Sequence, residues 1–309
     1  MTDTASQSPS QTPYTVLVIS VMAATFATIF IKLAQNAGMP SLLIAAGRMV
    51  LASLILSPLV LYRYRDELRQ LQRRDLLIAL FGGFWLAVHF IFLVLALARL
   101  PVIIAIVILN TGPIWVALLE KLFLKATINR FVWIGMAVAF AGGLIIAIAG
   151  NTGTSFVQYD NILFGSLLAV CASVAGSAYL VIGRSIRRKF SLFPYVWIVF
   201  GVGGLVASLA VIGTRTPIVG LPTPSYLWLL MLTLIPQLIG HSGFNYVVKY
   251  FPATVLAIVN QSLTVTSSIV AFFVFDEVPG LIEIIGSVIV VIGVIVTIYA
   301  PYLARKRKP

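Results

Sequence analysis

The chain has 309 residues, of which 60% are hydrophobic and only 10% are charged, and its mean hydropathy is +1.06. About 25% of the residues of a typical soluble domain are charged, so this composition excludes a water-soluble globular protein. The net charge of +12 does not indicate a nucleic-acid partner, because the basic residues stand in short clusters between apolar runs. Cys171 is the only cysteine, which excludes an intramolecular disulfide.

Residues 1–13 are rich in Ser, Thr, Gln and Pro, and we expect them to form a disordered tail. They contain no Lys or Arg, so the basic region of a cleavable signal peptide is missing. Apolar runs of roughly 20 residues follow, long enough for α-helices that span a bilayer. The ten predicted spans are 14–34, 41–62, 76–98, 101–121, 131–150, 162–183, 192–213, 225–247, 252–275 and 279–300.

The distribution of lysine and arginine predicts how these spans are oriented. With the N-terminus in the cytoplasm, the cytoplasmic connections and the basic tail 301–309 hold seventeen of these residues, and the outer side holds three. Such an excess is typical of cytoplasmic loops. We therefore expect an all-α integral protein of the inner (plasma) membrane, with both termini cytoplasmic.

The two halves of the chain, 14–150 and 162–300, repeat the same spacing of proline, amide and glycine residues. A shift of 151 residues aligns Pro101 with Pro252, Asn110 with Gln261, Gly135 with Gly286 and Gly142 with Gly293. Since each half holds five predicted spans, the second half enters the membrane from the opposite side, which is an inverted-topology repeat. The alternative is a chance match between apolar sequences. The glycines of each half lie seven apart on one helix face and predict close helix packing, a scaffold role.

Sequence motifs in both halves indicate a family. The first half reads Pro-Ile-Trp-Val-Ala-Leu-Leu over 113–119, and the second reads Ser-Ser-Ile-Val-Ala-Phe-Phe-Val-Phe-Asp-Glu over 267–277. Each is followed by a glycine-bearing span. The pattern resembles the EamA repeat of the drug/metabolite transporter superfamily, over about 14–300. The resemblance implies ten helices and export or exchange of amino acids, metabolites or drugs. Glu277 has Ala126 as its first-half counterpart, so a role that needs both glutamates does not carry over.

Two amides are predicted near the membrane midplane. Asn110 lies nine residues after Pro101, and Gln261 lies nine residues after Pro252. Nine helical residues rise roughly 13–14 Å, close to half of a ~30 Å hydrocarbon core. An amide offers donors and an acceptor to a polar solute. The two side chains either line a solute site or join helices through hydrogen bonds.

Gln237, His241 and Asn245 follow one another at intervals of four and form a polar stripe along span 225–247. A stripe of this kind is expensive against lipid, so we expect it to face protein or water and to line the solute site. Pro236, directly before the stripe, is expected to kink the helix and to free a carbonyl.

Five further polar or aromatic residues within the spans are candidates for substrate contact. His89 and Trp85 share one face of span 76–98, and Thr28 and Ser177 are hydroxyl-bearing residues whose alternative is a bond to the backbone. Arg48 lies about seven residues into its span, at a depth of roughly 10 Å. It either extends to the outer interface or binds a substrate carboxylate. Lys32 is nearer the outer surface and is expected to reach it.

These features predict a secondary transporter, an exporter or exchanger, that moves a small metabolite such as an amino acid by alternating access. The alternative within the class is multidrug efflux. It is disfavoured because no carboxylate falls mid-membrane in spans 14–34, 76–98, 162–183 or 225–247. A channel and an intramembrane enzyme are the rivals from other classes, and the sequence has no hydrolase or zinc motif. We expect no catalytic residue, metal or cofactor; the partners are a small solute and the lipid bilayer, with homodimerisation left open.

Overall fold

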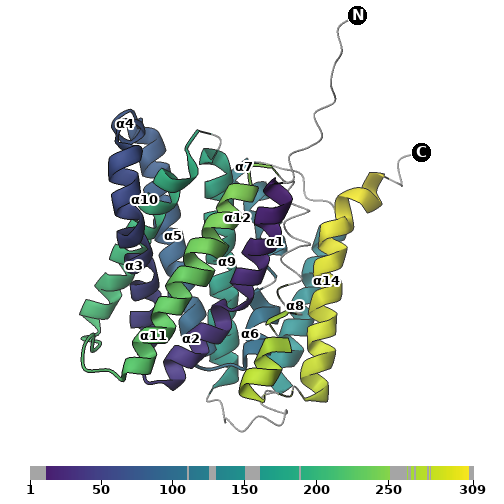
Figure 1. The fold of residues 1–309 in the computed structure, drawn as a ribbon. Helices are drawn as coiled ribbons and strands as arrows, with labels where there is room; N and C mark the ends of the chain where they lie inside the picture. The colour runs from purple at the N-terminus through teal and green to yellow at the C-terminus, as the bar shows by residue number, and fades with distance from the viewer. Residues whose placement is uncertain are drawn as a thin grey trace, which may run out of the picture.

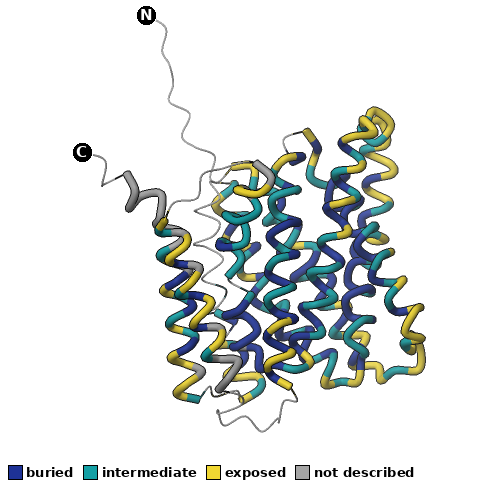
Figure 2. Tube along the Cα trace, turned by 180° about the vertical axis from the view of Figure 1, so that it is seen from behind, coloured by how far each residue is buried: buried dark blue, intermediate teal, exposed yellow. Residues whose placement is uncertain are grey.

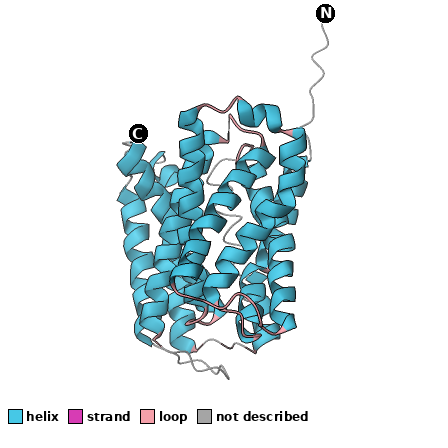
Figure 3. Ribbon diagram, turned by 90° about the vertical axis from the view of Figure 1, so that its left-hand side faces the viewer, coloured by secondary structure: helices cyan, strands magenta, loops and turns pink. Residues whose placement is uncertain are grey.

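The computed structural model describes residues 12–109, 111–124, 130–149, 161–187, 189–250, 263, 266–267, 269–276, 278 and 280–305. The regular elements in this part of the chain are helices joined by loops (Figure 3). The first half comprises α1 (Thr12–Thr25), α2 (Ala27–Asn36), α3 (Ser41–Arg63), α4 (Arg65–Arg69), α5 (Arg73–Leu97), α6 (Val102–Leu109), α7 (Gly112–Leu124) and α8 (Arg130–Ala149).

The second half continues the bundle with one irregular helix among regular ones. It comprises α9 (Ile162–Ile186), α10 (Leu192–Gly213), α11 (Thr223–Leu232), the π-helix η1 (Thr233–His241), α12 (Ser242–Val247) and α14 (Leu281–Arg305). These bounds follow the predicted spans within a few residues. The predicted tail 1–13 lies almost wholly outside the described residues, as does most of span 252–275.

Six of the described helical stretches are long and apolar enough to cross a membrane. They are Thr12–Asn36, Ser41–Arg63, Arg73–Leu97, Ile162–Ile186, Leu192–Gly213 and Thr223–Val247. Shorter apolar helices cover Ile104–Leu119, Trp133–Gly142 and Ile284–Gly293. The chain is therefore a multi-pass membrane protein, whereas the number ten stays a prediction.

Helix α1 begins and helix α14 ends at the same end of the bundle, the upper end in Figure 1. An even number of crossings requires this arrangement. The short helix α4, which holds Arg65 and Arg69 beside Asp66 and Glu67, lies at that end too (Figure 1). The compartment that this end faces stays a prediction from the positive charges of the sequence.

Glycines bring α8 and α14, the equivalent helices of the two halves, into close contact. A Cβ atom added at Gly142 would lie 2.7 Å from both the Gly286 carbonyl oxygen and the Val290 amide nitrogen, and one at Gly293 would meet the backbone of Gly135 and Ala139. Backbone atoms cannot move aside as flexible side chains do, so these positions require glycine for this packing. The predicted packing role of the two glycine pairs matches this geometry.

Burial follows the bundle as expected for a protein in lipid. Buried residues line the interior, and exposed ones lie on the periphery (Figure 2). Large apolar side chains remain exposed on the outer helix faces, among them Leu205, Leu209, Phe140 and Phe273, at 68–76% of their surface. In water such a surface would be an aggregation site, and in a bilayer it contacts acyl chains.

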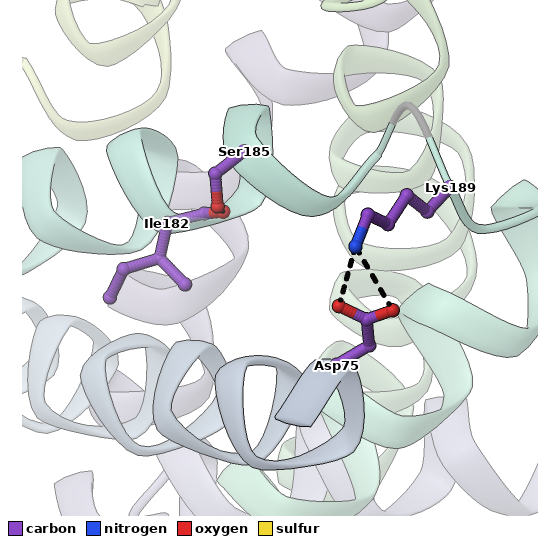
Figure 4. A network of polar contacts seen from close by, with 4 residues as sticks. All are labelled: Asp75, Ile182, Ser185 and Lys189. Carbon is purple, nitrogen blue, oxygen red and sulfur yellow. Dashed lines mark hydrogen bonds and ion pairs between the residues drawn. The ribbon is translucent and has the colours of Figure 1, made fainter. Parts of the chain in front are cut away.

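Polar contacts connect the start of α5 to the loop between α9 and α10. Lys189 Nζ lies 3.1 Å and 3.3 Å from the two carboxylate oxygens of Asp75 (Figure 4). Close by, the Ser191 amide donates to Glu67 Oε1 over 2.8 Å. These contacts join a connection of the first half to a connection of the second half at the end of the bundle that carries α4.

Candidate functional site

Arg48 lies inside the bundle on α3 with none of its surface exposed. Its Nε donates a hydrogen bond of 2.8 Å to Gln237 Oε1 on η1. Its guanidinium carbon lies 3.9 Å from the centroid of the Phe90 ring on α5, the distance of a cation–π contact. The structure excludes the alternative in which Arg48 extends to the outer interface and leaves the binding of an anion as the open one. We name Arg48, Gln237 and Phe90 the arginine centre.

Gln237 is fully buried and follows Pro236 directly on η1. Pro236 has no amide hydrogen, and residues Thr233–His241 around it form a π-helix instead of an α-helix. From this π-helix the Gln237 side chain bonds Arg48 on α3. The π-helical stretch lies where the sequence predicts a kink, and such stretches are frequent at functional sites.

The two histidines flank the arginine centre. The ring of Phe90 meets the ring of His241 edge-on, with 5.1 Å between centroids, and its centroid lies 5.0 Å from that of His89. Both histidines are close enough to Arg48 to interact with its charge. His89 Nδ1 also forms a hydrogen bond of 2.7 Å with the Ala172 carbonyl on α9. Gly176 permits this approach, because a Cβ there would lie 2.7 Å from His89 Nδ1.

Asn245, the third residue of the predicted stripe, hydrogen-bonds to other residues of the protein. It lies on α12, closer than Gln237 to the end of the bundle that carries α4 (Figure 1). Its amide exchanges hydrogen bonds of 2.7 Å and 3.0 Å with the hydroxyl of Tyr179 on α9. The backbone carbonyl of Asn245 accepts from Arg187 Nε over 2.9 Å, and Arg187 Nη1 donates to the Phe190 carbonyl over 2.6 Å. The stripe thus faces protein, as predicted, but Asn245 belongs to a separate polar cluster from the arginine centre.

Ser177 and its neighbour Ser173 stabilise the interruption between α6 and α7. The Ser173 hydroxyl donates to the Leu109 carbonyl over 2.8 Å, and the Ser177 hydroxyl lies 3.1 Å from the Gly112 carbonyl. These carbonyls belong to the last residue of α6 and the first residue of α7. The Ser177 hydroxyl also bonds the Ser173 carbonyl in its own helix. Its described hydrogen bonds therefore go to backbone carbonyls, which is the alternative to substrate contact.

Two further predicted site residues, Thr28 and Trp85, lie in surroundings that differ from each other. Thr28 is buried on α2, and its hydroxyl has no hydrogen-bond partner among the described residues. Trp85 packs edge-on against Phe81 and Phe84, two side chains with 54% and 42% exposed surface. Among the described contacts, none joins Trp85 to Arg48. Asn110 and Gln261, the predicted midplane pair, lie outside the described residues.

Lys32 corrects one expectation. It was expected to reach the outer surface, but it is buried and its ammonium group donates to the carbonyls of Leu97 and Leu100 over 2.7 Å and 3.1 Å. These carbonyls lie at the C-terminal end of α5, where a cation compensates the unpaired acceptors and the helix dipole.

Sequence reasoning did not identify Phe90, Tyr179 or Arg187. Phe90 is one of many apolar residues in its span, and only the position of Arg48 gives it a role. Tyr179 and Arg187 lie near the end of a long apolar helix, where a tyrosine and an arginine are typical interface residues. Asn245, which both of them contact, is more than fifty residues away from each in the chain, so no local pattern signals these two contacts.

The arginine centre can bind a polar group but carries no metal-binding arrangement. No group of three His, Cys, Asp or Glu residues that suits a metal ion occurs among the residues described. The centre combines a positive charge, an amide and an aromatic face in the interior of the helix bundle. Groups of these kinds can recognise a solute through hydrogen bonds and charge.

Comparisons with known proteins agree with this architecture. The EamA-like transporter family matches the chain twice, over residues 11–148 and 163–299. The chain is 23% identical over 255 residues to the uncharacterized transporter YdfC of Bacillus subtilis (strain 168), covering 82% of this chain and 80% of that protein. It is 22% identical over 261 residues to an uncharacterized transporter of Archaeoglobus fulgidus, covering 82% and 87%.

One protein of known crystal structure superimposes with a TM-score of 0.64. It is 18% identical, and the match covers 97% of this chain and 99% of that chain. This likeness shows the fold alone. The matches to the family confirm the resemblance that the repeated motifs predict.

Proposed function

Because the chain belongs to the EamA-like transporter family, we propose that it is a secondary carrier of a small polar or amphipathic metabolite, such as an amino acid. In this proposal it works by alternating access in the plasma membrane, as an exporter or exchanger. The observation that carries the proposal is the arginine centre, a charged and hydrogen-bonding group enclosed by the apolar helices α3, α5 and η1. An enclosed ionisable group in a membrane protein is a functional candidate because its burial is unfavourable for stability.

Interrupted helices around the centre support a carrier. The helix pair α1 and α2 is interrupted by a turn at Phe26, a turn at Thr111 precedes α7, and η1 divides α11 from α12. Discontinuous helices expose backbone groups to a bound solute and are typical of transporter binding sites. They also give the bundle points at which one segment tilts relative to the next.

The charge of the centre bears on the alternative of multidrug efflux. A lipophilic cation entering between α3 and η1 would meet the positive charge of Arg48, whose described contacts are with neutral groups. Like charges repel strongly where the effective dielectric constant is low. A neutral, zwitterionic or anionic solute is therefore favoured over a cationic drug.

Uptake into proteoliposomes tests the proposal. Purified protein is assayed with labelled amino acids, organic acids, purines and cationic dyes, and protein-free liposomes are the control. We expect saturable uptake of at least one metabolite, accelerated by the same unlabelled solute on the opposite side. Flux that rises linearly with concentration would indicate a channel. Saturable uptake confined to the cationic dyes would favour multidrug efflux.

A further inference from the structure

Arg48 and Gln237 together present more hydrogen-bond donors than their described neighbours accept. Arg48 Nη1, Arg48 Nη2 and Gln237 Nε2 are all buried, and none has a hydrogen-bond partner among the described residues. A buried donor without an acceptor is unfavourable by about 1–3 kcal/mol, and more when it is charged. Three such donors at one place distinguish this position from the rest of the bundle.

The orientation of the donors is fixed by the contacts that are made. Gln237 Oε1 must face Arg48, because Arg48 Nε is a donor and cannot receive a bond from the amide nitrogen. The amide nitrogen of Gln237 is therefore not bonded to Arg48, and it has no acceptor among the described residues. Phe90 covers one face of the guanidinium plane at 3.9 Å. The end of the guanidinium formed by Nη1 and Nη2 is the part left without an acceptor among the described residues.

A carboxylate fits this end of the guanidinium. Two coplanar N–H donors bind the two oxygens of a carboxylate in a bidentate pair, which is the strongest geometry available to arginine. A neutral acceptor, such as an amide oxygen, would satisfy one donor without neutralising the buried charge. Two other cations are buried among the described residues: Lys32 donates to the Leu97 and Leu100 carbonyls, and Arg187 donates to the Asn245 and Phe190 carbonyls. A single positive charge matches a monoanionic group better than a doubly charged phosphate.

We propose that Arg48, assisted by Gln237 and Phe90, binds the carboxylate group of the transported solute. This inference rests on the proposed carrier function and narrows its substrate to compounds with a free carboxylate. The body of the solute then lies beyond the Nη atoms, and the His241 and His89 rings flank the aromatic face on which the guanidinium stacks.

Binding of matched carboxylate and amide pairs to the purified protein tests the assignment. The probes are lactate, phenylacetate, L-leucine and L-phenylalanine, each with its carboxamide, up to about 10 mM, so that dissociation constants in the millimolar range are detected. We expect at least one carboxylate to bind, and its carboxamide to bind at least tenfold more weakly. Absence of binding by every carboxylate, or tighter binding of the carboxamides, would overturn the inference.

Two variants assign the effect to the arginine centre. Arg48→Gln removes the charge, and we expect at least a tenfold loss of carboxylate affinity. Gln237→Glu keeps the size of the side chain and supplies an internal carboxylate for Arg48, so it should compete with the ligand and weaken binding as strongly. It does so without removing a buried residue, which keeps the test informative if Arg48→Gln fails to fold. Arg63→Gln, the same substitution at an exposed position of α3, is the control.

The outcomes separate this inference from the carrier proposal. Carboxylate binding that stays within twofold of wild type in both Arg48→Gln and Gln237→Glu contradicts the inference. Saturable uptake of a neutral solute that is insensitive to both substitutions contradicts it too, while the carrier function stands. A folded protein that takes up no member of the panel contradicts the carrier function itself.

Discussion

At the scale of single residues, Arg48 is the side chain whose presence packing alone does not explain. It is fully buried, and its described contacts are with a neutral amide and a neutral ring. Replacing a buried charged group and its partner with apolar residues of similar volume is often neutral or stabilising. A fold optimised only for packing would therefore place a methionine or leucine here. The arginine is better explained by what it binds.

Stability of the double variant Arg48→Met/Gln237→Leu separates these two explanations. Both members of the pair become apolar, so no buried hydrogen-bonding group of the pair is left unsatisfied. We expect the free energy of unfolding in detergent to be unchanged or raised by about 1–4 kcal/mol, while carboxylate binding is lost. A large drop in the melting temperature would show that the arginine centre serves the fold instead.

Lys32 has the opposite character, because its ammonium group satisfies acceptors of the protein itself. In Lys32→Met the carbonyls of Leu97 and Leu100 lose the donor that the structure shows. We expect a loss of about 1–3 kcal/mol in the free energy of unfolding, measured by thermal denaturation in detergent. Lys32→Arg keeps the charge and should recover part of the loss. An unchanged melting temperature of Lys32→Met would refute the capping role.

At the scale of elements, the contact between α8 and α14 depends on glycine backbones. In Gly142→Ala the new methyl group would lie 2.7 Å from two backbone atoms of α14, which cannot give way without separating the helices. Overpacking of this kind lowers stability by about 1–3 kcal/mol. We expect a lower melting temperature of the purified protein.

Gly213 provides the matched control for this substitution. It is the last residue of α10, and a Cβ added there would meet nothing within 4 Å. Gly213→Ala should leave the melting temperature unchanged or slightly raised, since alanine reduces the entropy of the unfolded chain. Equal effects of the two substitutions would contradict the packing account.

The π-helix η1 shows how one element connects sequence to site. Pro236, which has no backbone donor, lies within this π-helix, and the adjacent Gln237 bonds Arg48 on a helix nearly two hundred residues away in the chain. The sequence predicts an irregularity at Pro236 through a simple rule about proline. Which side chain the irregularity redirects, and toward what, depends on the packing of α3 against η1.

At the scale of the whole molecule, the described helices were predictable and the contacts between them were not. Runs of apolar residues define a membrane helix with few alternatives, because every backbone group must be satisfied within the segment. The glycine spacing indicated which faces of α8 and α14 pack. The sequence also marked Arg48, Gln237, His241 and His89 as polar residues in an apolar setting. It did not pair them, because pairing depends on helix rotation and on the interruptions in α1–α2, α6–α7 and η1.

The two halves meet in ways that suit relative motion. Helices α8 and α14 hold equivalent positions of the halves together through backbone contact, whereas Lys189 and Asp75 join the halves through a partly exposed ion pair. A partly exposed pair contributes only about 0–1 kcal/mol and breaks readily. In the proposed alternating-access carrier, the first contact would serve as a fixed scaffold, and the second would break when this end of the bundle opens.

In the proposed carrier the arginine centre is reached from both sides of the membrane in turn, and the accessibility of a cysteine beside the centre is the direct measurement of this. Cys171 is replaced by serine and His241, which contacts Phe90, by cysteine. The protein is then exposed to a membrane-impermeant thiol reagent in spheroplasts and in inverted vesicles. We predict labelling of Cys-substituted position 241 from both sides, slowed on both by a transported solute. Labelling from one side only, or from neither, would contradict the account.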